Sequence, residues 1–270
     1  MIKKRVLFVA QEIMPYLPEN HMSNICRFLP QKTQESGKEI RTFMPRYGLV
    51  NERRNQLHEV IRLSGMNLII NDIDMPLIIK VASIPRERMQ VYFIDNEEYF
   101  KRKALFTNED NELFEDNDER AIFFAKGVLE TVKKLNWAPD IIHVSGWLAS
   151  LIPLYLKEYY KNDALFSHSK IVYSVYNEPF EGNLTGDLIK KLQFDNIPEE
   201  KLTFLKEPNF NNLSKIAIAN SDAVIQGSFS LPLDIVKYLE EFENPILEYK
   251  PEEEFAEAYH DFYQNQVLKS

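Results

Sequence analysis

The chain of 270 residues contains little cysteine and little glycine. Its single cysteine, Cys26, excludes a framework of disulfides within the chain, and its apolar neighbours predict a small buried side chain. None of the eight glycines forms part of a Gly-x-Gly-x-x-Gly motif or of a phosphate loop ending in Gly-Lys-Ser or Gly-Lys-Thr. The sequence therefore offers no motif for binding a dinucleotide or a nucleoside triphosphate.

Long apolar runs and an excess of positive charge are also missing. No stretch approaches the ~20 apolar residues of a membrane span. The apolar run after the basic N-terminus covers only residues 6–10, which is too short for the core of a secretion signal and predicts a first β-strand. The net charge of −9 disfavours nucleic acid and anionic lipid. We expect a cytoplasmic protein whose partners are neither nucleic acid nor membrane.

Groups of residues that bind metal or carry out nucleophilic chemistry are scarce as well. The five histidines are scattered, and His21 with Cys26 is the one pair that approaches metal-ligand spacing. Ser145 follows His143 at the end of an expected strand, but it lacks the Gly-x-Ser-x-Gly context of a hydrolase nucleophile. A turn serine that bonds the local backbone is the simpler interpretation. The sequence predicts no metal, no cofactor and no catalytic residue of these kinds.

Short β-branched and aromatic runs alternate with helical periods along most of the chain. Asp116, with Glu119 three residues later, predicts a capping box that opens a helix. Residues 147–159 predict another helix, in which Pro153 either kinks the helix or marks its first turn. These features predict an α/β protein with a Rossmann-like, doubly wound, mostly parallel sheet. The expected parallel strands are residues 5–9, 39–43, 91–94, 140–144, 170–175 and 223–226.

Two segments interrupt this alternation. Residues 57–83 contain apolar runs at 60–63, 67–70 and 77–81 between turn residues, which predicts an antiparallel hairpin or meander attached to the sheet. After residue 239, acidic residues gather around Pro245 and Pro251, as is typical of a solvated connector. We therefore expect a domain of residues 1–239, an acidic linker of residues 240–251 and a C-terminal amphipathic helix of residues 252–270.

The expected C-terminal helix has apolar positions at near-helical spacing, namely Phe255, Tyr259, Phe262 and Val267. We expect this face to pack on the α/β domain.

Several motifs follow one another at a recognisable spacing, at residues 6–15, 44–48, 91–100, 116–120, 137–143 and 174–177 with Gly182. In this order they resemble the N-terminal half of bacterial glycogen and starch synthases. The resemblance implies half of a GT-B fold and a glucosyltransferase that moves glucose from ADP-glucose to an α-1,4-glucan. It also implies that a domain of this kind mainly holds the acceptor glucan. We expect a short form without the C-terminal domain that holds the nucleotide sugar.

The sequence departs from the family pattern where the family keeps reactive groups. The family's Lys-Thr-Gly-Gly-Leu loop corresponds to residues 18–22, so that Pro18 replaces the lysine and two glycines that admit phosphate are lost. The family's His-Asp pair corresponds to Ser145 and Gly146, and a further histidine corresponds to Tyr176. Losing one charge-stabilising group typically lowers a rate by roughly 10² to 10³. We predict a pseudoenzyme, catalytically impaired on its own.

Residues at the rim of the expected sheet can still bind a sugar, because an amide and aromatic faces hydrogen-bond and stack without catalysing a reaction. Two functions stay open. The first is a glycogen/starch synthase-like protein of glycogen biosynthesis with vestigial or partner-dependent activity. The second is a non-catalytic module that binds α-glucan or a full-length synthase. The candidate substrate-binding residues are Glu12, Tyr99, Trp147, Tyr176 and Asn177.

Overall fold

The computed structural model describes residues 3–84, 87 and 89–269. Within these residues the strands are β1 (Arg5–Ala10), β2 (Glu39–Pro45), β3 (His58–Glu59), β4 (Met66–Ile70), β5 (Ile73–Ser83), β6 (Gln90–Asp95), β7 (Ile141–Ser145), β8 (Lys170–Val175), β9 (Ala223–Gln226) and β10 (Ile246–Leu247). The α-helices are α1 (His21–Glu35), α2 (Glu97–Phe100), α3 (Asn117–Lys134), α4 (Leu151–Glu158), α5 (Leu188–Phe194), α6 (Phe210–Ala219), α7 (Leu233–Glu240) and α8 (Phe255–Phe262). Short 3-10 turns are η1 (Trp147–Ala149), η2 (Glu199–Lys201) and η3 (Thr203–Lys206), and a π-helical turn, η4 (Tyr263–Val267), follows α8.

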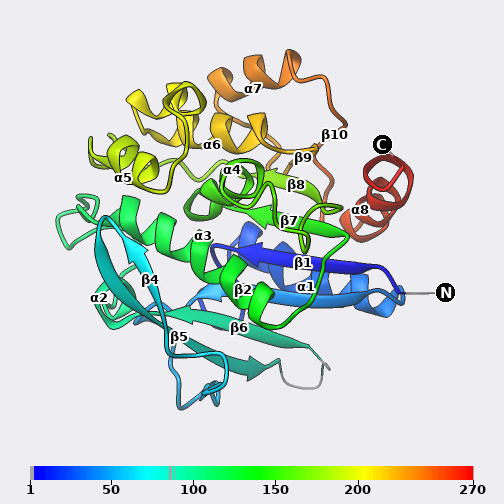
Figure 1. The fold of residues 1–270 in the computed structure, drawn as a ribbon. Helices are drawn as coiled ribbons and strands as arrows, with labels where there is room; N and C mark the ends of the chain where they lie inside the picture. The colour runs from blue at the N-terminus through cyan, green and yellow to red at the C-terminus, as the bar shows by residue number, and fades with distance from the viewer. Residues whose placement is uncertain (1–2, 85–86, 88, 270) are drawn as a thin grey trace.

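One sheet organises the described residues, and its strand order is β10-β9-β8-β7-β1-β2-β6-β5-β3, with β4 paired to β5 (Figure 1). The strands from β10 to β6 are parallel, whereas β5 is antiparallel to β6. The six parallel strands expected from the sequence are confirmed, and β10 adds a seventh. The fold is the α/β, Rossmann-like, doubly wound and mostly parallel sheet that the apolar runs predict.

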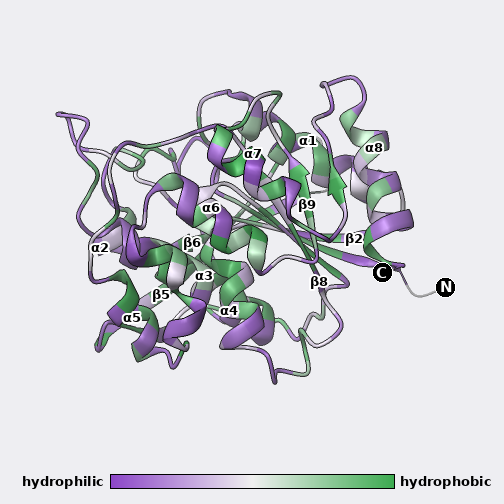
Figure 2. Cartoon of the chain, turned by 90° about the horizontal axis from the view of Figure 1, so that it is seen from above, coloured by the Kyte–Doolittle hydropathy of each residue, from purple (hydrophilic) through white to green (hydrophobic). Residues whose placement is uncertain are grey.

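The two faces of the sheet bury separate apolar clusters. Along β1, Val6 and Phe8 pack with α1 and α8 on one face, while Leu7 and Val9 pack in the larger cluster on the other face. Helices α3, α4 and α6 cover that second face (Figure 1). Seen from above, the strands are largely hydrophobic and the hydrophilic residues lie mostly on the helices and loops around them (Figure 2). The alternation of side chains along a strand accounts for the two clusters.

The segment expected as an antiparallel hairpin is confirmed, with one correction. Strands β4 and β5 pair antiparallel and are joined at Asn71 and Asp72, which have φ angles of 49° and 62°, as a two-residue hairpin turn requires. The apolar run at residues 60–63 is a turn and not a strand, because Leu63 N–H donates to the Val60 carbonyl at 2.8 Å. Apolar composition without alternation does not distinguish the two.

The helix starts also differ in detail from the expectation. Helix α3 follows Asp116, but the predicted capping box is wrong, because the Asp116 carboxylate binds Arg102 and the Glu119 carboxylate accepts from the Tyr99 hydroxyl at 2.9 Å. Charged and phenolic partners outcompete the backbone for these carboxylates. Pro153 lies in the first turn of α4, which resolves the two alternatives left open by the sequence in favour of a helix start.

The C-terminal segment lies against the α1 face of the sheet. Residues 240–251, expected as a solvated linker, include β10, which pairs in parallel with β9 and extends the sheet. Helix α8 begins at Phe255, three residues after the expected start, and η4 continues it. The four expected apolar positions are buried against β1 and α1. In addition, the Tyr263 hydroxyl lies 2.6 Å from Nδ1 of the buried His143 on β7.

Among the described residues, no helix has both the length and the apolar character that crossing a membrane would require.

Candidate functional site

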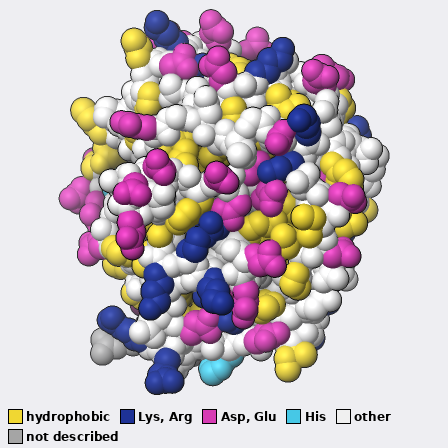
Figure 3. Space-filling view, turned by 90° about the vertical axis from the view of Figure 1, so that its left-hand side faces the viewer, with side chains coloured by type: hydrophobic (Ala, Val, Ile, Leu, Met, Phe, Trp, Pro, Cys, Tyr) yellow, Lys and Arg dark blue, Asp and Glu magenta, His cyan; other side chains and the backbone are white. Residues whose placement is uncertain are grey.

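A cavity of about 760 Å³ lies at the carboxyl ends of β1, β7 and β8. In open α/β sheets this edge is where ligands bind. Figure 3 views the molecule from the side toward which β1 points, where acidic, basic and apolar side chains are interspersed. We call the cavity at the carboxyl ends of these three strands the rim cavity. Its lining residues are Gln11, Glu12, Asn20, Leu105, Phe106, Thr107, Asn111, Leu113, Trp147, Glu178, Pro179, Phe180 and Glu181.

Two of the five residues predicted from the sequence, Glu12 and Trp147, line the rim cavity. The Glu12 carboxylate accepts hydrogen bonds from Gln11 Nε2 at 3.1 Å and from Asn20 Nδ2 at 3.0 Å. The indole of Trp147 packs between Phe106 and Phe180, with ring centroids 4.6 Å and 4.8 Å away. These residues combine aromatic walls with a fixed carboxylate, the arrangement expected of a site for an uncharged polar ligand.

The other three predicted residues lie outside the lining of the rim cavity. Tyr99 is buried against α3 and donates its hydroxyl to Glu119. Tyr176 is buried beside Gly227, and burial raises the pKa of its hydroxyl well above the usual value. Asn177 is exposed, and its backbone N–H donates to Ser228 Oγ at 2.9 Å. The first two are buried in the packed interior, and Asn177 precedes the lining residue Glu178 in the sequence.

Two further carboxyl groups that line the rim cavity, those of Glu178 and Glu181, were missed by the sequence reasoning. Glu178 follows β8 and lines the cavity together with Glu12. Burial and the negative charge of Glu12 raise the pKa of Glu178 to about 7. Near neutral pH this side chain is therefore partly protonated and can donate as well as accept a hydrogen bond. The signal available in the sequence was an acidic residue three positions after a buried strand.

The backbone at Gly146 is closed off by Gln11. Gly146 has a φ of 90°, and a Cβ placed there would lie 2.6 Å from the Cβ of Gln11. The Gln11 side chain is fixed in this place because its Oε1 accepts from the Leu148 N–H at 3.0 Å. An aspartate at this position would meet both backbone strain and a steric clash. The Gln11 side chain thus leaves no room for a side chain at position 146.

The ring of Tyr176 packs closely against a second glycine, Gly227. A Cβ at Gly227 would lie 2.7 Å from the Tyr176 ring, so the ring sits directly on the loop after β9. His21 Nε2 lies 2.8 Å from the Gly227 carbonyl oxygen, and its ring is 6.2 Å from that of Tyr176. The start of α1 and the loops after β8 and β9 are therefore linked by side-chain contacts.

The loop before α1 is satisfied by its own residues. Asn20 caps α1, since its Oδ1 accepts from the Ser23 N–H at 2.7 Å, while the Asn20 N–H donates to Ser23 Oγ at 2.9 Å. The Pro18 carbonyl accepts from the same hydroxyl at 3.1 Å. Because a helix N-terminus binds anions through free N–H groups, this capping box reduces its value as a phosphate site.

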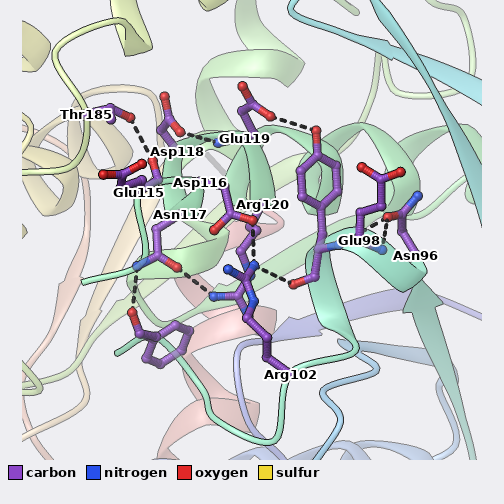
Figure 4. A network of polar contacts seen from close by, with 12 residues as sticks. Asn96, Glu98, Arg102, Glu115, Asp116, Asn117, Asp118, Glu119, Arg120 and Thr185 are labelled. Carbon is purple, nitrogen blue, oxygen red and sulfur yellow. Dashed lines mark hydrogen bonds and ion pairs between the residues drawn. The ribbon is translucent and has the colours of Figure 1, made fainter. Parts of the chain in front are cut away.

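One wall of the rim cavity is held by a buried network at the start of α3 (Figure 4). Asn117 Nδ2 donates to the Phe106 carbonyl at 2.8 Å, and Arg120 Nη1 donates to Asn117 Oδ1 at 2.6 Å. The Arg120 guanidinium lies 5.3 Å from the Phe100 ring and 5.5 Å from the Phe114 ring. Burial lowers the pKa of Arg120 to about 10. The network therefore fixes Phe106, which contacts Trp147.

The described residues contain no group of three or more His, Cys, Asp or Glu side chains arranged to hold a metal ion. The Cys26 thiol is buried, and burial raises its pKa to about 12, which disfavours the thiolate that metals bind. His21 is engaged with the Gly227 carbonyl. The one pair with metal-ligand spacing thus has other roles.

Comparisons with known proteins identify relatives over most of the chain. Residues 5–244 match the family described as "Starch synthase catalytic domain". The glycogen synthase of Chlorobium limicola is 40% identical over 197 residues, which cover 73% of this chain and 40% of that protein. The glycogen synthase of Chlorobium luteolum is 38% identical over 221 residues, covering 81% of this chain and 44% of that protein. The chain thus spans less than half the length of these two relatives.

A solved structure shares the fold. It is the catalytic domain of Starch Synthase IV from Arabidopsis thaliana bound to ADP and acarbose, with a TM-score of 0.72 and 16% sequence identity. The match covers 91% of this chain and 52% of the other chain.

Proposed function

The chain belongs to the starch synthase catalytic domain family, and from this premise we propose that it holds an α-1,4-glucan in the rim cavity without transferring glucose on its own. It is glycogen/starch synthase-like, as its relatives named glycogen synthase indicate. The relatives' full activity belongs to longer proteins, so its extension to this chain is part of what has to be tested.

The observation that carries this proposal is the Gln11 side chain lying over Gly146. A transition state in which charge develops needs preorganised polar and charged groups around it, and each lost group costs roughly 10² to 10³ in rate. Here the position that the family gives to an aspartate is filled by a neutral amide bonded to the Leu148 N–H. Restoring the acid would require moving Gln11 as well, so the loss is built into the surrounding packing.

The retained groups favour a neutral sugar over a phosphate. Phe180, which packs on the buried Trp147, offers aromatic surface, while Glu12 and Asn20 line the same cavity with hydrogen-bonding groups. Glu12 and Glu178 are both acidic, and the pKa of about 7 at Glu178 reflects burial and the repulsion between them. A phosphate would add further negative charge to this pair, whereas a sugar hydroxyl can donate to one carboxylate and accept from a protonated one.

Isothermal titration of the purified chain with maltoheptaose and with ADP-glucose tests the proposal. We expect weak, saturable heat with maltoheptaose and none with ADP-glucose. Phe180→Ala should abolish the maltoheptaose signal, because Phe180 packs on Trp147 in the cavity wall. Phe229→Ala is the matched control, since Phe229 is 87% exposed and outside the cavity lining. Tight ADP-glucose binding, or maltoheptaose binding unaffected by Phe180→Ala, would contradict the proposal.

A second candidate function is docking onto a full-length synthase. The observation that favours it is the exposure of Phe229 and Leu233, which follow β9 at the same edge of the sheet and are 87% and 68% exposed. Apolar side chains so exposed are typical of contact surfaces when they cluster. Sedimentation of the chain with the Chlorobium limicola glycogen synthase would reveal a complex, and the double variant Phe229→Ala with Leu233→Ala should weaken it. Independent sedimentation of the two proteins would remove this candidate.

A further inference from the structure

A second cavity, of about 560 Å³, lies between β4, α3, α4 and α5, and it shares no lining residue with the rim cavity. Figure 1 shows β4 running beside α3 on this side of the sheet. We call it the α3–α5 groove, and the lining residues that matter here are Asn67, Ile69, Lys126, Glu130, Tyr159 and Phe194. We propose that the groove binds a short neutral oligosaccharide.

The walls of the groove are held together by one buried ion pair. Lys126 Nζ donates to the Ile69 carbonyl at 2.8 Å and to Asp195 Oδ1 at 2.6 Å. Asp195 Oδ2 accepts from the Tyr155 hydroxyl at 2.6 Å. These bonds join β4, α3, α4 and the end of α5. Since the Lys126 and Asp195 side chains are only 6% and 7% exposed, the groove is preformed and does not need to be ordered by its ligand.

Three exposed apolar side chains gather in this groove. Among the described residues, eight large apolar side chains are strongly exposed, and three of them line the groove: Ile69 at 48%, Tyr159 at 45% and Phe194 at 47%. Leaving such surface in water is unfavourable, and its gathering in one concave place is a mark of a binding site. The axial C–H groups of a pyranose form an apolar face that packs against an aromatic ring, so Tyr159 and Phe194 suit a sugar.

The polar groups of the groove are better suited to the hydroxyl groups of a neutral ligand than to a charged ligand. The side chains of Asn67 and Asn196 both line the groove and are exposed, so their amides face solvent there. The Glu130 carboxylate accepts from the Tyr160 hydroxyl at 2.8 Å through Oε1. Two carboxylates, Glu130 and Asp195, and one ammonium, Lys126, give the lining a formal charge of −1, which disfavours an anionic ligand.

The Lys126 ammonium is already engaged with a carboxylate and a carbonyl, and it lies 5.5 Å from the Tyr159 ring. It is therefore a support for the groove and not a free cation that would select phosphate or sulfate. A neutral oligosaccharide is the class that uses both the aromatic faces and the amide groups.

A tryptophan reporter tests the groove directly in the full chain. Phe194→Trp keeps an aromatic face at the site, and its fluorescence should change saturably as maltoheptaose is added. Ile61→Trp is the matched control, because Ile61 is 83% exposed and outside both cavities. The native Trp137 and Trp147 are each 3% exposed and contribute equally to both variants. The choice of an α-1,4-glucan as probe rests on the proposed function.

Adding Tyr159→Ala to Phe194→Trp should weaken the binding roughly tenfold, which corresponds to about 1.4 kcal/mol. Adding Phe180→Ala instead should leave the groove signal unchanged, so failure of the rim site and failure of the groove are distinguished. The proposal is overturned if Phe194→Trp responds no more than Ile61→Trp. It is equally overturned if Tyr159→Ala converts a self-associated chain to monomer in sedimentation, because the groove would then be an interface between copies.

Discussion

The rim of the sheet and the packed body beneath it differ in the contacts that their side chains make. In the body, Arg120 and Asn117 form a buried network that holds the cavity wall, and the tail helix is tied to the sheet through Tyr263 and His143. At the rim, Gln11 fills the space above Gly146. The body is thus held by buried hydrogen bonds between side chains, whereas at the rim a neutral amide leaves no room for a side chain at position 146.

The largest expected effect comes from removing the tail. Helix α8 and η4 bury Phe255, Tyr259, Phe262 and Tyr263 against the sheet, and aromatic burial contributes about 1.5 to 3 kcal/mol per side chain, against a typical total stability of about 5 to 15 kcal/mol. Deleting residues 252–270 should lower the midpoint of thermal unfolding by many degrees and cause aggregation. A truncated chain that melts with the full chain and stays monomeric would show that the tail is not part of the packed body.

The next effect concerns the wall network. Replacing Arg120 by alanine leaves Asn117 without its buried donor and empties an aromatic cage, which should cost about 3 to 5 kcal/mol. Arg120→Met keeps the volume and removes the charge, so it should cost much less. Urea unfolding of both variants is the measurement. Equal stabilities of the two variants would mean that the cation itself, and not the filled cage, supports the wall.

The fold could be predicted from the sequence further than the site. Apolar runs such as residues 170–175 give the buried strands directly, because a strand covered on both faces has no polar side to hide. Glu12 and Trp147 were found because they directly follow strands that end at the same edge. Phe106 was not, since its position depends on the long-range bond from Asn117. Tyr99 was placed at the rim by resemblance, but its hydroxyl binds Glu119 on α3.

The buried His143 should make the free energy of unfolding depend on pH in acid. Burial lowers the pKa of His143 from 6.5 to about 3. Below the pKa of His143 in the unfolded chain, the unfolded chain binds a proton that the native chain does not bind. The free energy of unfolding should therefore fall by about 1.4 kcal/mol for each unit by which the pH is lowered from ~6.5 to ~3. For His143→Gln, the free energy of unfolding measured with urea should be lower at neutral pH, because the two hydrogen bonds of His143 to Ser174 and Tyr263 change. It should also depend less on pH in this window. An unchanged slope would contradict the buried neutral imidazole.

Glu178 at the rim should make the free energy of unfolding depend on pH in the opposite direction and to a smaller extent. The pKa of Glu178 is raised from 4.5 to about 7, so between these values the native chain binds a proton that the unfolded chain does not. Its contribution to the free energy of unfolding therefore falls as the pH rises through this window. Glu178→Gln should remove that fall and stabilise the chain slightly above neutral pH. The effect is smaller than at His143 because the carboxyl is partly exposed. Destabilisation above neutral pH would count against the acidic pair.

Glucosyl transfer tests the central claim most directly. Purified chain, glycogen and radiolabelled ADP-glucose are incubated and the label in glycogen is measured against a mock preparation. We predict no incorporation above the mock, because Pro18, Gly146 and Tyr176 occupy the positions where the family keeps reactive groups, and Gln11 closes the space above Gly146. Incorporation above the mock that disappears in Glu12→Gln or Phe180→Ala would contradict the account, since the rim would then still carry out the chemistry.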